Sequence, residues 1–489
     1  MRRLSLLGVL LFASYAYFYQ AGGWSQNSRF DLVRAIVEQG TIRIDAFHDN
    51  TGDKAVAGGH YYTDKAPGAS WTAVPAVAVV RKLVGAAGGA VNDPRSIAWL
   101  SYVATLASAA MPGALAGVCL FLLARRFGAS EYAALMATIG FGLSTPMWAY
   151  GTLFFGHALA AACLVGACLA ADMLRDSPTD AARDVRQGAM VGLLAGWAVV
   201  TEFPSAIGAV ILSGLALMYA WPGGRARVVR VGVAIALGAG LCATALGIYQ
   251  NAAFGSPFHI SYASEENSEL LRAGVFGITL PRPRVIAELL WGSYRGLLPL
   301  SPIVLFAPIG LWRYWRRSGG RWTALAAGAT MLLYLLMNAA YEHWEGGWDY
   351  GPRHLVPALV LWCLGIAGAW DAARSWGRAV MTVCICFGIA CSLVAVATTP
   401  QPPAPGYAHP MRELLWPAFH AGRLAINDQS ILDVRPPHGW AGLRPSGVSW
   451  NLGQKTGLQG LMSLTPLAAV WILGGLVWLS LAPETRPDG

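Results

Sequence analysis

Charged residues are scarce in this sequence. Asp, Glu, Lys and Arg make up 12% of its 489 residues, whereas 55% are hydrophobic, which is too little charge for the surface of a water-soluble protein. Lysine is scarcer still, with 4 lysines against 31 arginines. The composition excludes an ordinary soluble domain and predicts a chain whose main solvent is the lipid bilayer.

The sequence also lacks cysteine outside its apolar stretches. No disulfide framework is therefore expected. Cys384 and Cys386 are too close for a two-residue redox spacing and have no histidine neighbours, so we interpret them as packing residues. The eight cysteines are Cys119, Cys163, Cys168, Cys242, Cys363, Cys384, Cys386 and Cys391.

The net charge of +9 does not indicate a nucleic-acid partner. The arginines lie at the edges of apolar stretches rather than in one basic patch, and we expect no nucleic-acid binding. The sequence has no DxD motif and no HExxH-like spacing, so no obligatory divalent ion or other cofactor is expected.

Apolar stretches close to the ~20 residues that cross a bilayer recur along the chain. They predict an all-α, polytopic transmembrane bundle of about twelve spans. The first is expected to be an uncleaved anchor, because no clear small-x-small cleavage site precedes Gly22. The spans lie near 4–20, 98–124, 131–149, 155–174, 188–200, 205–220, 231–249, 297–312, 322–340, 355–373, 379–398 and 463–482.

The short loops set the orientation, because Lys and Arg remain on the cytoplasmic side. Arg2 and Arg3 place the N-terminus inside, and the C-terminus with Arg486 follows. The apolar segment 66–86, interrupted by Pro67 and Pro75, would invert everything after it if it were a span, so we predict a re-entrant or interfacial element. The predicted cytoplasmic side also holds Arg125, Arg126, Arg175, Arg183, Arg186, Arg225, Arg227, Arg230, Arg313, Arg316, Arg317, Arg321, Arg374 and Arg378.

Four long loops are left outside, at 21–97, 250–296, 341–354 and 399–462, and we expect the working surface there. The bilayer is the first partner, and a bacterial inner membrane is the expected location. Two units are predicted: a transmembrane catalytic core at 1–398 that carries the outer loop 21–97, and an outer loop with the last span at 399–489.

The first outer loop carries two patterns. Residues 28–39 place Phe30, Val33, Ile36 and Val37 on one stripe, which predicts an amphipathic interfacial helix ended by Gly40. The second pattern is a polar and aromatic cluster at 58–68, GGHYYTDKAPG. A lysine in so lysine-poor a sequence suits a lipid phosphate, although Lys65 could also pair with Asp64 or extend to the headgroups. Candidate donor-binding residues here are His60, Tyr61, Tyr62 and Lys65.

The segment 341–357 joins aromatic residues to Arg353 and His354, which suit a phosphate or carboxylate. Its tryptophan and tyrosine rings either anchor the chain at the membrane edge or stack on a sugar. Glu202 and His157 are polar residues in or near predicted spans. Glu202 could instead satisfy backbone freed by Pro204, and His157 could be a hydrogen-bonded core residue. The candidate substrate-pocket residues are Trp348, Tyr350, Glu345, Glu202, His157 and Arg295.

In their order along the chain these features resemble the membrane-embedded GT-C glycosyltransferases, particularly the family 39 relatives that include protein O-mannosyltransferases and lipid A aminoarabinose transferases. The resemblance spans most of the chain. It rests on the short first span, the long outer loop with its helix and the Lys65–Ala66–Pro67 motif, followed by LLARRFG at 122–128, SPIVLF at 301–306 and GPRHLVPAL at 351–359.

The resemblance implies an enzyme that transfers one sugar, with inversion, from a polyprenyl-phosphate carrier to a glycan, lipid or protein acceptor on the extracytoplasmic face. Lys65 would match the family's phosphate-binding lysine. The family carries acids ahead of an Arg-Tyr pair at the start of the first-loop helix, whereas this sequence has Gln26 and Asn27 before Arg29 and Phe30.

The next carboxylate is Asp31, which we predict as the catalytic base, with Asp53 and Asp64 as alternates. Ser28 and Asp31 also have the spacing of a helix-capping box, and one residue could serve both roles. Two other functions stay open. A glycan ligase that uses a lipid pyrophosphate would use outward arginines such as Arg282, Arg284 and Arg295, and a lipid-linked glycan flippase would show inverted repeats, which are not evident.

Overall fold

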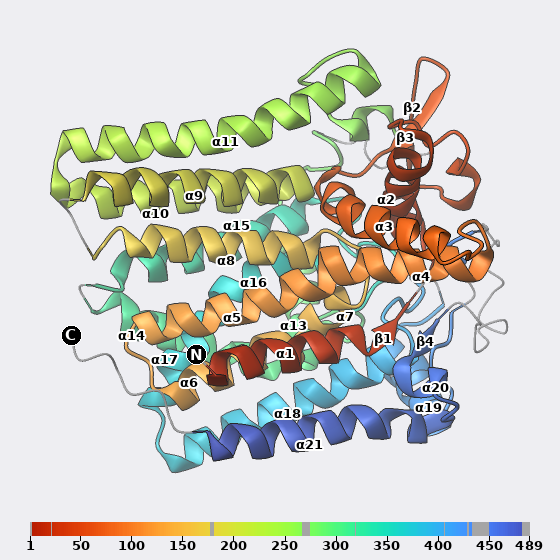
Figure 1. Cartoon of the computed structure of the whole chain (residues 1–489). Helices are drawn as coiled ribbons and strands as arrows, with labels where there is room; N and C mark the ends of the chain where they lie inside the picture. The colour runs from red at the N-terminus through yellow and green to blue at the C-terminus, as the bar shows by residue number, and fades with distance from the viewer. Residues whose placement is uncertain are drawn as a thin grey trace.

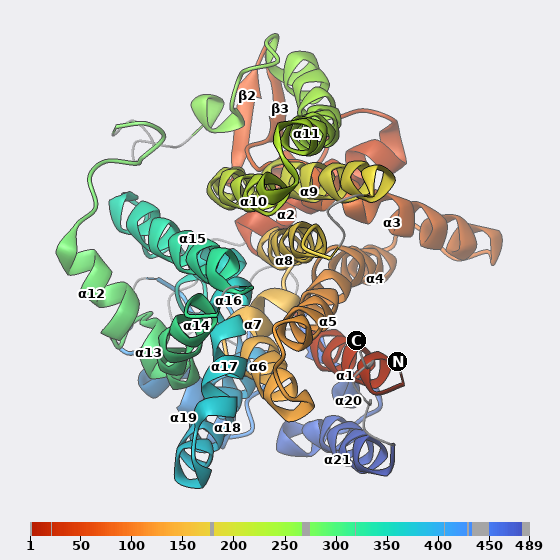
Figure 2. The same cartoon turned by 90° about the vertical axis from the view of Figure 1, so that its left-hand side faces the viewer.

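The protein is a bundle of helices that run back and forth between two ends (Figure 1). It is described by a computed structural model, which covers residues 2–20, 22–176, 180–266, 274–317, 319–404, 406–427, 430–432 and 449–481. Figure 2 looks along the bundle, so that most long helices are seen end-on. The chain is mostly helical, as its apolar composition predicts, because a helix satisfies its own backbone hydrogen bonds in lipid.

The lengthwise elements follow one another in chain order. They are α1 (Arg2–Ala16), α4 (Pro94–Thr105), α5 (Met111–Arg126), α6 (Glu131–Leu143), α7 (Met147–Gly151), α8 (His157–Met173), α9 (Ala181–Thr201), α10 (Ala206–Ala220), α11 (Arg225–Phe254), α13 (Leu297–Leu300), α14 (Ala307–Trp315), α15 (Arg321–Ala340), α16 (Val356–Trp362), α17 (Leu364–Ala372), α18 (Ser375–Thr398) and α21 (Thr465–Ser480). The remaining helices are α2 (Trp24–Arg34), α3 (Gly68–Ala86), α12 (Pro283–Trp291), α19 (Trp416–His420) and α20 (Leu452–Lys455).

Within the described residues, six helices are long and apolar enough to cross a membrane, or seven if the bent pair α16 and α17 is one span. Each of the twelve predicted spans coincides with a helix or with consecutive helices, but the count of twelve stays a prediction. The helix that contains the predicted span 188–200 is longer than that span: α9 begins at Ala181, where Asp180 accepts a hydrogen bond from the Arg183 backbone N–H. The turn at Glu202 joins α9 to α10.

Both described ends of the chain lie at the same end of the bundle, with the beginning of α1 beside the end of α21 (Figure 1). Arg3 donates to the backbone oxygen of Leu481 and pairs with Glu131 at 2.9 Å. The first outer loop, α19 and α20 lie at the opposite end, which agrees with the predicted sides of the loops. Arg486 lies outside the described residues.

The segment 66–86 forms the continuous helix α3, with Pro75 inside it. In Figure 2, where the long helices are seen end-on, α3 is seen along its length at the edge of the bundle. It is not among the helices that could span a membrane. That this segment is a re-entrant or interfacial element stays a prediction, and its helix continues through Pro75 without a break.

Helix α2 begins four residues earlier than expected and continues as a π-helical turn, Ala35–Gln39, before Gly40 ends it with φ of 66°. Phe30 and Val33 pack with residues of α3. Residues 26–33 are all buried, so the face expected to meet water is covered by protein. The idea of a capping box at Ser28 and Asp31 was wrong, since both residues lie inside the helix.

Two small antiparallel sheets interrupt the expected all-α fold. Strands β2 (Lys54–Ala57) and β3 (His60–Thr63) form a hairpin whose turn, Gly58–Gly59, has positive φ at both residues, as such tight turns require. Strand β1 (Phe18–Tyr19) pairs with β4 (Trp450–Asn451), which ties the end of α1 to the last outer loop. The hairpin places Asp64 and Lys65 where the chain turns toward α3.

Candidate functional site

Lys65 lies between two carboxylates at the end of the bundle that carries the first outer loop. Its Nζ is 2.9 Å from Oδ2 of Asp53 and 2.5 Å from Oδ2 of Asp64. Strand β3 positions Asp64, whose backbone oxygen accepts a hydrogen bond from Ser261 Oγ and whose Oδ1 accepts one from Ser28 Oγ. Segments far apart in the sequence therefore hold this group in place.

The two aspartates differ in their surroundings. The side chain of Asp64 is fully buried and that of Asp53 is 21% exposed. Burial alone would raise the pKa of Asp53, but the charge of Lys65, followed by those of Arg353 and Arg29, lowers it overall. Burial, together with repulsion from Asp53, raises the pKa of Asp64. The surroundings thus favour an ionised, accessible Asp53 beside a less acidic Asp64.

Glu265 is the third carboxylate in this group, within 4.8 Å of both aspartates by the nearest oxygens. Burial first, then the charge of Asp64, raises the pKa of Glu265 to about 7. Three carboxylates so close together could hold a metal ion. The ammonium of Lys65 already contacts two of them, and burial, which would lower its pKa, is outweighed by Asp53 and Asp64, so the pKa of Lys65 is raised.

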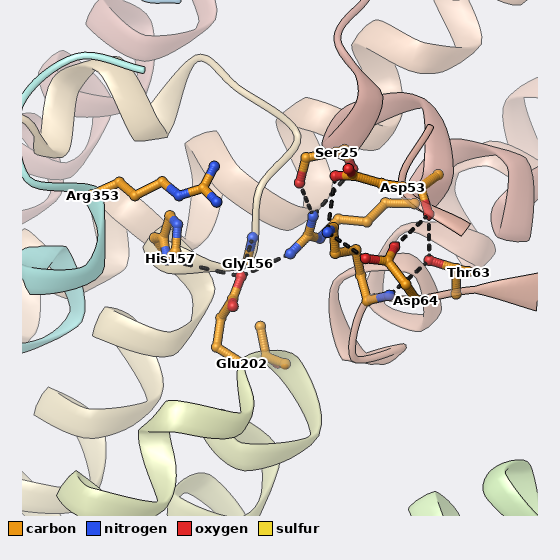
Figure 3. A network of polar contacts seen from close by, with 12 residues as sticks. Ser25, Asp53, Thr63, Asp64, Gly156, His157, Glu202 and Arg353 are labelled. Atoms are coloured by element: carbon orange, nitrogen blue, oxygen red, sulfur yellow. Dashed lines mark hydrogen bonds and ion pairs between the residues drawn. The ribbon is translucent and has the colours of Figure 1, made fainter. Parts of the chain in front are cut away.

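A second polar group centres on Glu202, at the turn after α9. Its Oε1 accepts a hydrogen bond from Arg29 Nη2 at 2.9 Å and one from the backbone N–H of Gly156 at 3.1 Å. His157 Nδ1 lies 3.8 Å from the same oxygen. Figure 3 shows Glu202 and His157 on one side of Gly156 with Asp53 and Asp64 on the other. Arg29 from α2 is thus held by a carboxylate 173 residues away.

Arg353 lies on the side of Gly156 that is opposite Asp53 and Asp64, next to His157 (Figure 3). The ring of Phe155 contacts both arginines: the guanidinium carbons of Arg29 and Arg353 each lie 5.6 Å from the ring centroid, within reach of a cation–π interaction. Arg353 Nε is 3.6 Å from Asp349. Across the described parts of the chain, the guanidinium of Arg353 makes no hydrogen bond, and its side chain is 20% exposed.

The structure brings together seven of the residues that the sequence singled out. His354 belongs with them, since its ring lies 6.1 Å from that of His157. The seven are Asp53, Asp64, Lys65, His157, Glu202, Arg353 and His354.

The aromatic part of the 58–68 cluster turns elsewhere. His60 Nδ1 lies 2.7 Å from Asp45 at the exposed tip of the hairpin. Tyr61 stacks on His48, with ring centroids 3.7 Å apart, and Tyr62 is buried against Phe254. Neighbouring side chains of β3 point to opposite faces, and none of these three contacts involves Lys65.

The contacts of four further candidates are mainly structural; three of them lie in the 341–354 loop, and the fourth, Arg295, packs against it. Arg295 donates to the backbone oxygen of Asp349 at 2.9 Å and also pairs with its carboxylate. Tyr350 is buried and its backbone oxygen accepts from Tyr150. Glu345 lies 3.8 Å from His343, and Trp348 is half-buried.

Asp31 lies in a different environment from Lys65. It is fully buried, its Oδ1 accepts from Asn50 Nδ2 at 2.9 Å, and its Oδ2 has no hydrogen-bond partner among the described residues. Burial raises its pKa well above the usual value. The amides Gln26 and Asn27 donate to backbone oxygens of Gln20 and of Asn50.

Sequence reasoning missed Arg29, Glu265 and Phe155. Arg29 was visible at the start of the first-loop helix, but nothing in the sequence indicated that Glu202 is its partner. Glu265 had no neighbouring signal, because only the fold brings the 250–296 loop to Lys65. Phe155 looked like an ordinary apolar residue of a span.

No protein-family model and no curated protein sequence matches the chain. Solved structures do. The chain aligns with ArnT from Cupriavidus metallidurans bound to undecaprenyl phosphate at 15% identity and a TM-score of 0.53, over 98% of this chain and 75% of that one. The apo state of the same protein aligns at 17% identity and a TM-score of 0.50, over 86% and 68%.

Identities this low establish the fold alone, since one fold hosts many activities. The lengthwise apolar helices and this likeness make the chain a multi-pass membrane protein. Its fold is the GT-C fold.

Proposed function

We propose that the protein is an integral-membrane glycosyltransferase. It takes a sugar from a polyprenyl-phosphate donor and transfers it, with inversion, to an acceptor hydroxyl at the end of the bundle that carries the first outer loop. The observation that carries the proposal is the meeting of Lys65, Arg353 and Asp53 at this end, with hydrogen-bonding capacity unused on Arg353. This fits an enzyme of the extracytoplasmic face of a bacterial inner membrane.

The donor phosphate lies between Arg353 and Lys65 in this proposal. The guanidinium of Arg353 has a planar set of N–H donors that suits phosphate oxygens. Lys65 uses two contacts on Asp53 and Asp64, and an ammonium has three donors, which leaves one for the phosphate. Both cations stabilise the negative charge that grows on the phosphate as the glycosidic bond breaks.

Asp53 is the base that the geometry favours. The acceptor oxygen forms its bond to the anomeric carbon as the bond to the phosphate oxygen breaks, and the hydroxyl proton passes to the Asp53 carboxylate. Asp53 is partly exposed and kept ionised by Lys65. Asp31, the first choice from sequence, is less suited because its carboxyl is fully buried and its pKa is raised.

We expect this transfer to need no divalent ion. Of the three carboxylates that a metal would bind, Asp53 and Asp64 already pair with the ammonium of Lys65. A ligase that uses a pyrophosphate donor would need further free cations. Arg282 is paired with Glu342 and Arg295 with Asp349, so neither favours that alternative.

The test is a turnover assay of purified protein with a labelled polyprenyl-phosphate sugar and an acceptor mixture. Arg353→Ala and Lys65→Ala should each lower turnover roughly 10²–10³-fold, as expected for loss of a charge-assisted contact in the transition state. Arg284→Ala, which removes an exposed arginine of the 250–296 loop, should stay near the wild-type rate. If both site variants are fully active, the phosphate site lies elsewhere.

A further inference from the structure

A pocket of about 440 Å³ lies outside the site described above, in the last outer loop. It lies between the segment after α19 and the turns around α20, and its lining includes Leu424, Trp450, Gln454, Lys455, Leu458 and Gln459. Its volume falls within the range of small-molecule sites. Of the described residues that line it, none is acidic and Lys455 alone is charged.

Lys455 is held but not neutralised. Its Nζ lies 4.8 Å from the ring of Trp450 and 6.0 Å from that of Trp99, and this placement fixes the ammonium through cation–π attraction. Among the residues that the structure describes, neither Lys455 nor the nearby Arg95 pairs with a carboxylate. Partial burial, and then the charge of Arg95, lower the pKa of Lys455.

The two cations come from elements that lie far apart in the sequence. Arg95 is exposed at the start of α4 and Lys455 ends α20. Contact between Trp99 and Trp450, with ring centroids 5.0 Å apart, holds these elements together. This packing brings the start of α4, which carries Asp93 and Arg95, to the end of α20, which carries Lys455.

The polar donors in the pocket suit a phosphate. Gln454 Oε1 accepts from the backbone N–H of Asn451 at 2.8 Å. That bond orients the side chain, and its amide N–H groups donate to no other residue in the described part of the chain. Together with the ammonium, they offer several donors to one anionic group.

An apolar path leads from the pocket along α21. Leu461 and Met462 are exposed next to the pocket, and Ile472, Leu473 and Leu476 are about 60% exposed further along the helix. This helix is the least covered by protein of the candidate spans. A hydrocarbon chain can therefore follow α21 while its headgroup reaches Lys455.

We propose that this pocket binds the phosphate headgroup of an anionic lipid, with Lys455 and Arg95 as its cations and the surface of α21 against its chain. The proposal does not depend on glycosyl transfer. It assigns a second phosphate site to the end of the bundle that carries the outer loops, apart from Lys65 and Arg353.

Native mass spectrometry of the full-length protein in neutral detergent tests this proposal, with phosphatidylglycerol, phosphatidylcholine and inorganic phosphate as probes. The wild type should bind phosphatidylglycerol in preference to phosphatidylcholine. A basic residue near a membrane contributes roughly a fivefold gain in affinity, so Lys455→Gln should weaken binding about fivefold and the double variant with Arg95→Gln about 25-fold. Lys455→Arg should retain it.

Two matched variants provide controls. Arg412→Gln removes one exposed charge from the same loop, and Lys82→Gln removes an exposed lysine from α3; both should bind phosphatidylglycerol as the wild type does. Unchanged binding by Lys455→Gln at unaltered thermal stability would overturn the proposal, as would equal weakening by Arg412→Gln. Preference for inorganic phosphate, with no difference between the two lipids, would identify a free-anion site and reject the lipid.

Discussion

The two ends of the bundle use the same kinds of residue in different ways. At the end that holds both described chain ends, each buried carboxylate is shared by two arginines. Asp184 pairs with Arg227 at 2.9 Å and with Arg230 at 2.8 Å, and Asp172 pairs with two arginines in the same way. At the opposite end Arg353 has one ion pair, at 3.6 Å, and no hydrogen bond among the described residues.

The difference separates charges that hold the fold from charges that are available to a ligand. Arg227, for example, donates to Asp184 and to the backbone oxygens of Tyr219 and Leu174, so most of its N–H donors are used within the protein. Where pairing is incomplete, the desolvated cation gains most from a bound phosphate. For buried arginines of this protein, N–H donors used within the fold therefore indicate a structural role, and unused donors indicate a candidate site.

The largest expected effect is at Asp53. Asp53→Asn keeps the shape but removes the base, so turnover should fall about 10²–10⁴-fold while thermal stability changes little. Asp31→Asn is the comparison variant and should keep most of its activity. Both rates come from the labelled-donor assay with purified protein. The reverse pattern would restore Asp31 as the base and would show that exposure is a poor guide here.

The next effect belongs to the opposite end. Asp184→Asn leaves the buried guanidinium of Arg227 without its partner, and this should cost about 3–5 kcal/mol of stability while turnover per folded molecule stays unchanged. Denaturant unfolding in detergent measures the loss of stability, and the transfer assay measures turnover. Asp176→Asn is the matched control, because the side chain of Asp176 is 38% exposed in its pair with Arg126. It should lower stability by less than about 1 kcal/mol. A loss of turnover in folded Asp184→Asn would break the comparison between the ends.

A smaller effect concerns pH. Because the pKa of Glu265 rises from 4.5 to about 7 on folding, the native state binds more protons than the unfolded state between these values. Stability should therefore fall as pH rises from about 4.5 to about 7. Glu265→Gln should reduce this slope in thermal unfolding measured across that range. An identical slope in the variant would show that Glu265 is not the group responsible.

The smallest expected effect is none. Excess chelator should leave turnover unchanged, because the ammonium of Lys65 already contacts two carboxylates of the acidic group, Asp53 and Asp64. The measurement is the transfer rate before and after exhaustive chelation. Complete loss, restored by Mg²⁺ or Mn²⁺, would show that a metal displaces Lys65 during the reaction.

Local pattern was enough for the helices and for part of the site. Apolar length located the segments that became α5, α11, α15 and α18, because a helix in lipid must satisfy its backbone within itself. The rarity of lysine pointed to Lys65, and the Arg353–His354 pair was visible as a motif. The burial of α2 could not be foreseen, since an amphipathic stripe does not tell whether its polar face meets water or protein.

The sequence by itself determined that the chain crosses a membrane many times, which loops lie together, and that Lys65 and Arg353 are candidates for a phosphate. Only the tertiary structure decided that Arg29 is held by Glu202 and that Asp53, rather than Asp31, lies beside Lys65 with part of its surface exposed. The reason is physical. Membrane insertion depends on local composition, whereas the pairing and pKa of a charged group depend on partners that the fold brings from distant segments.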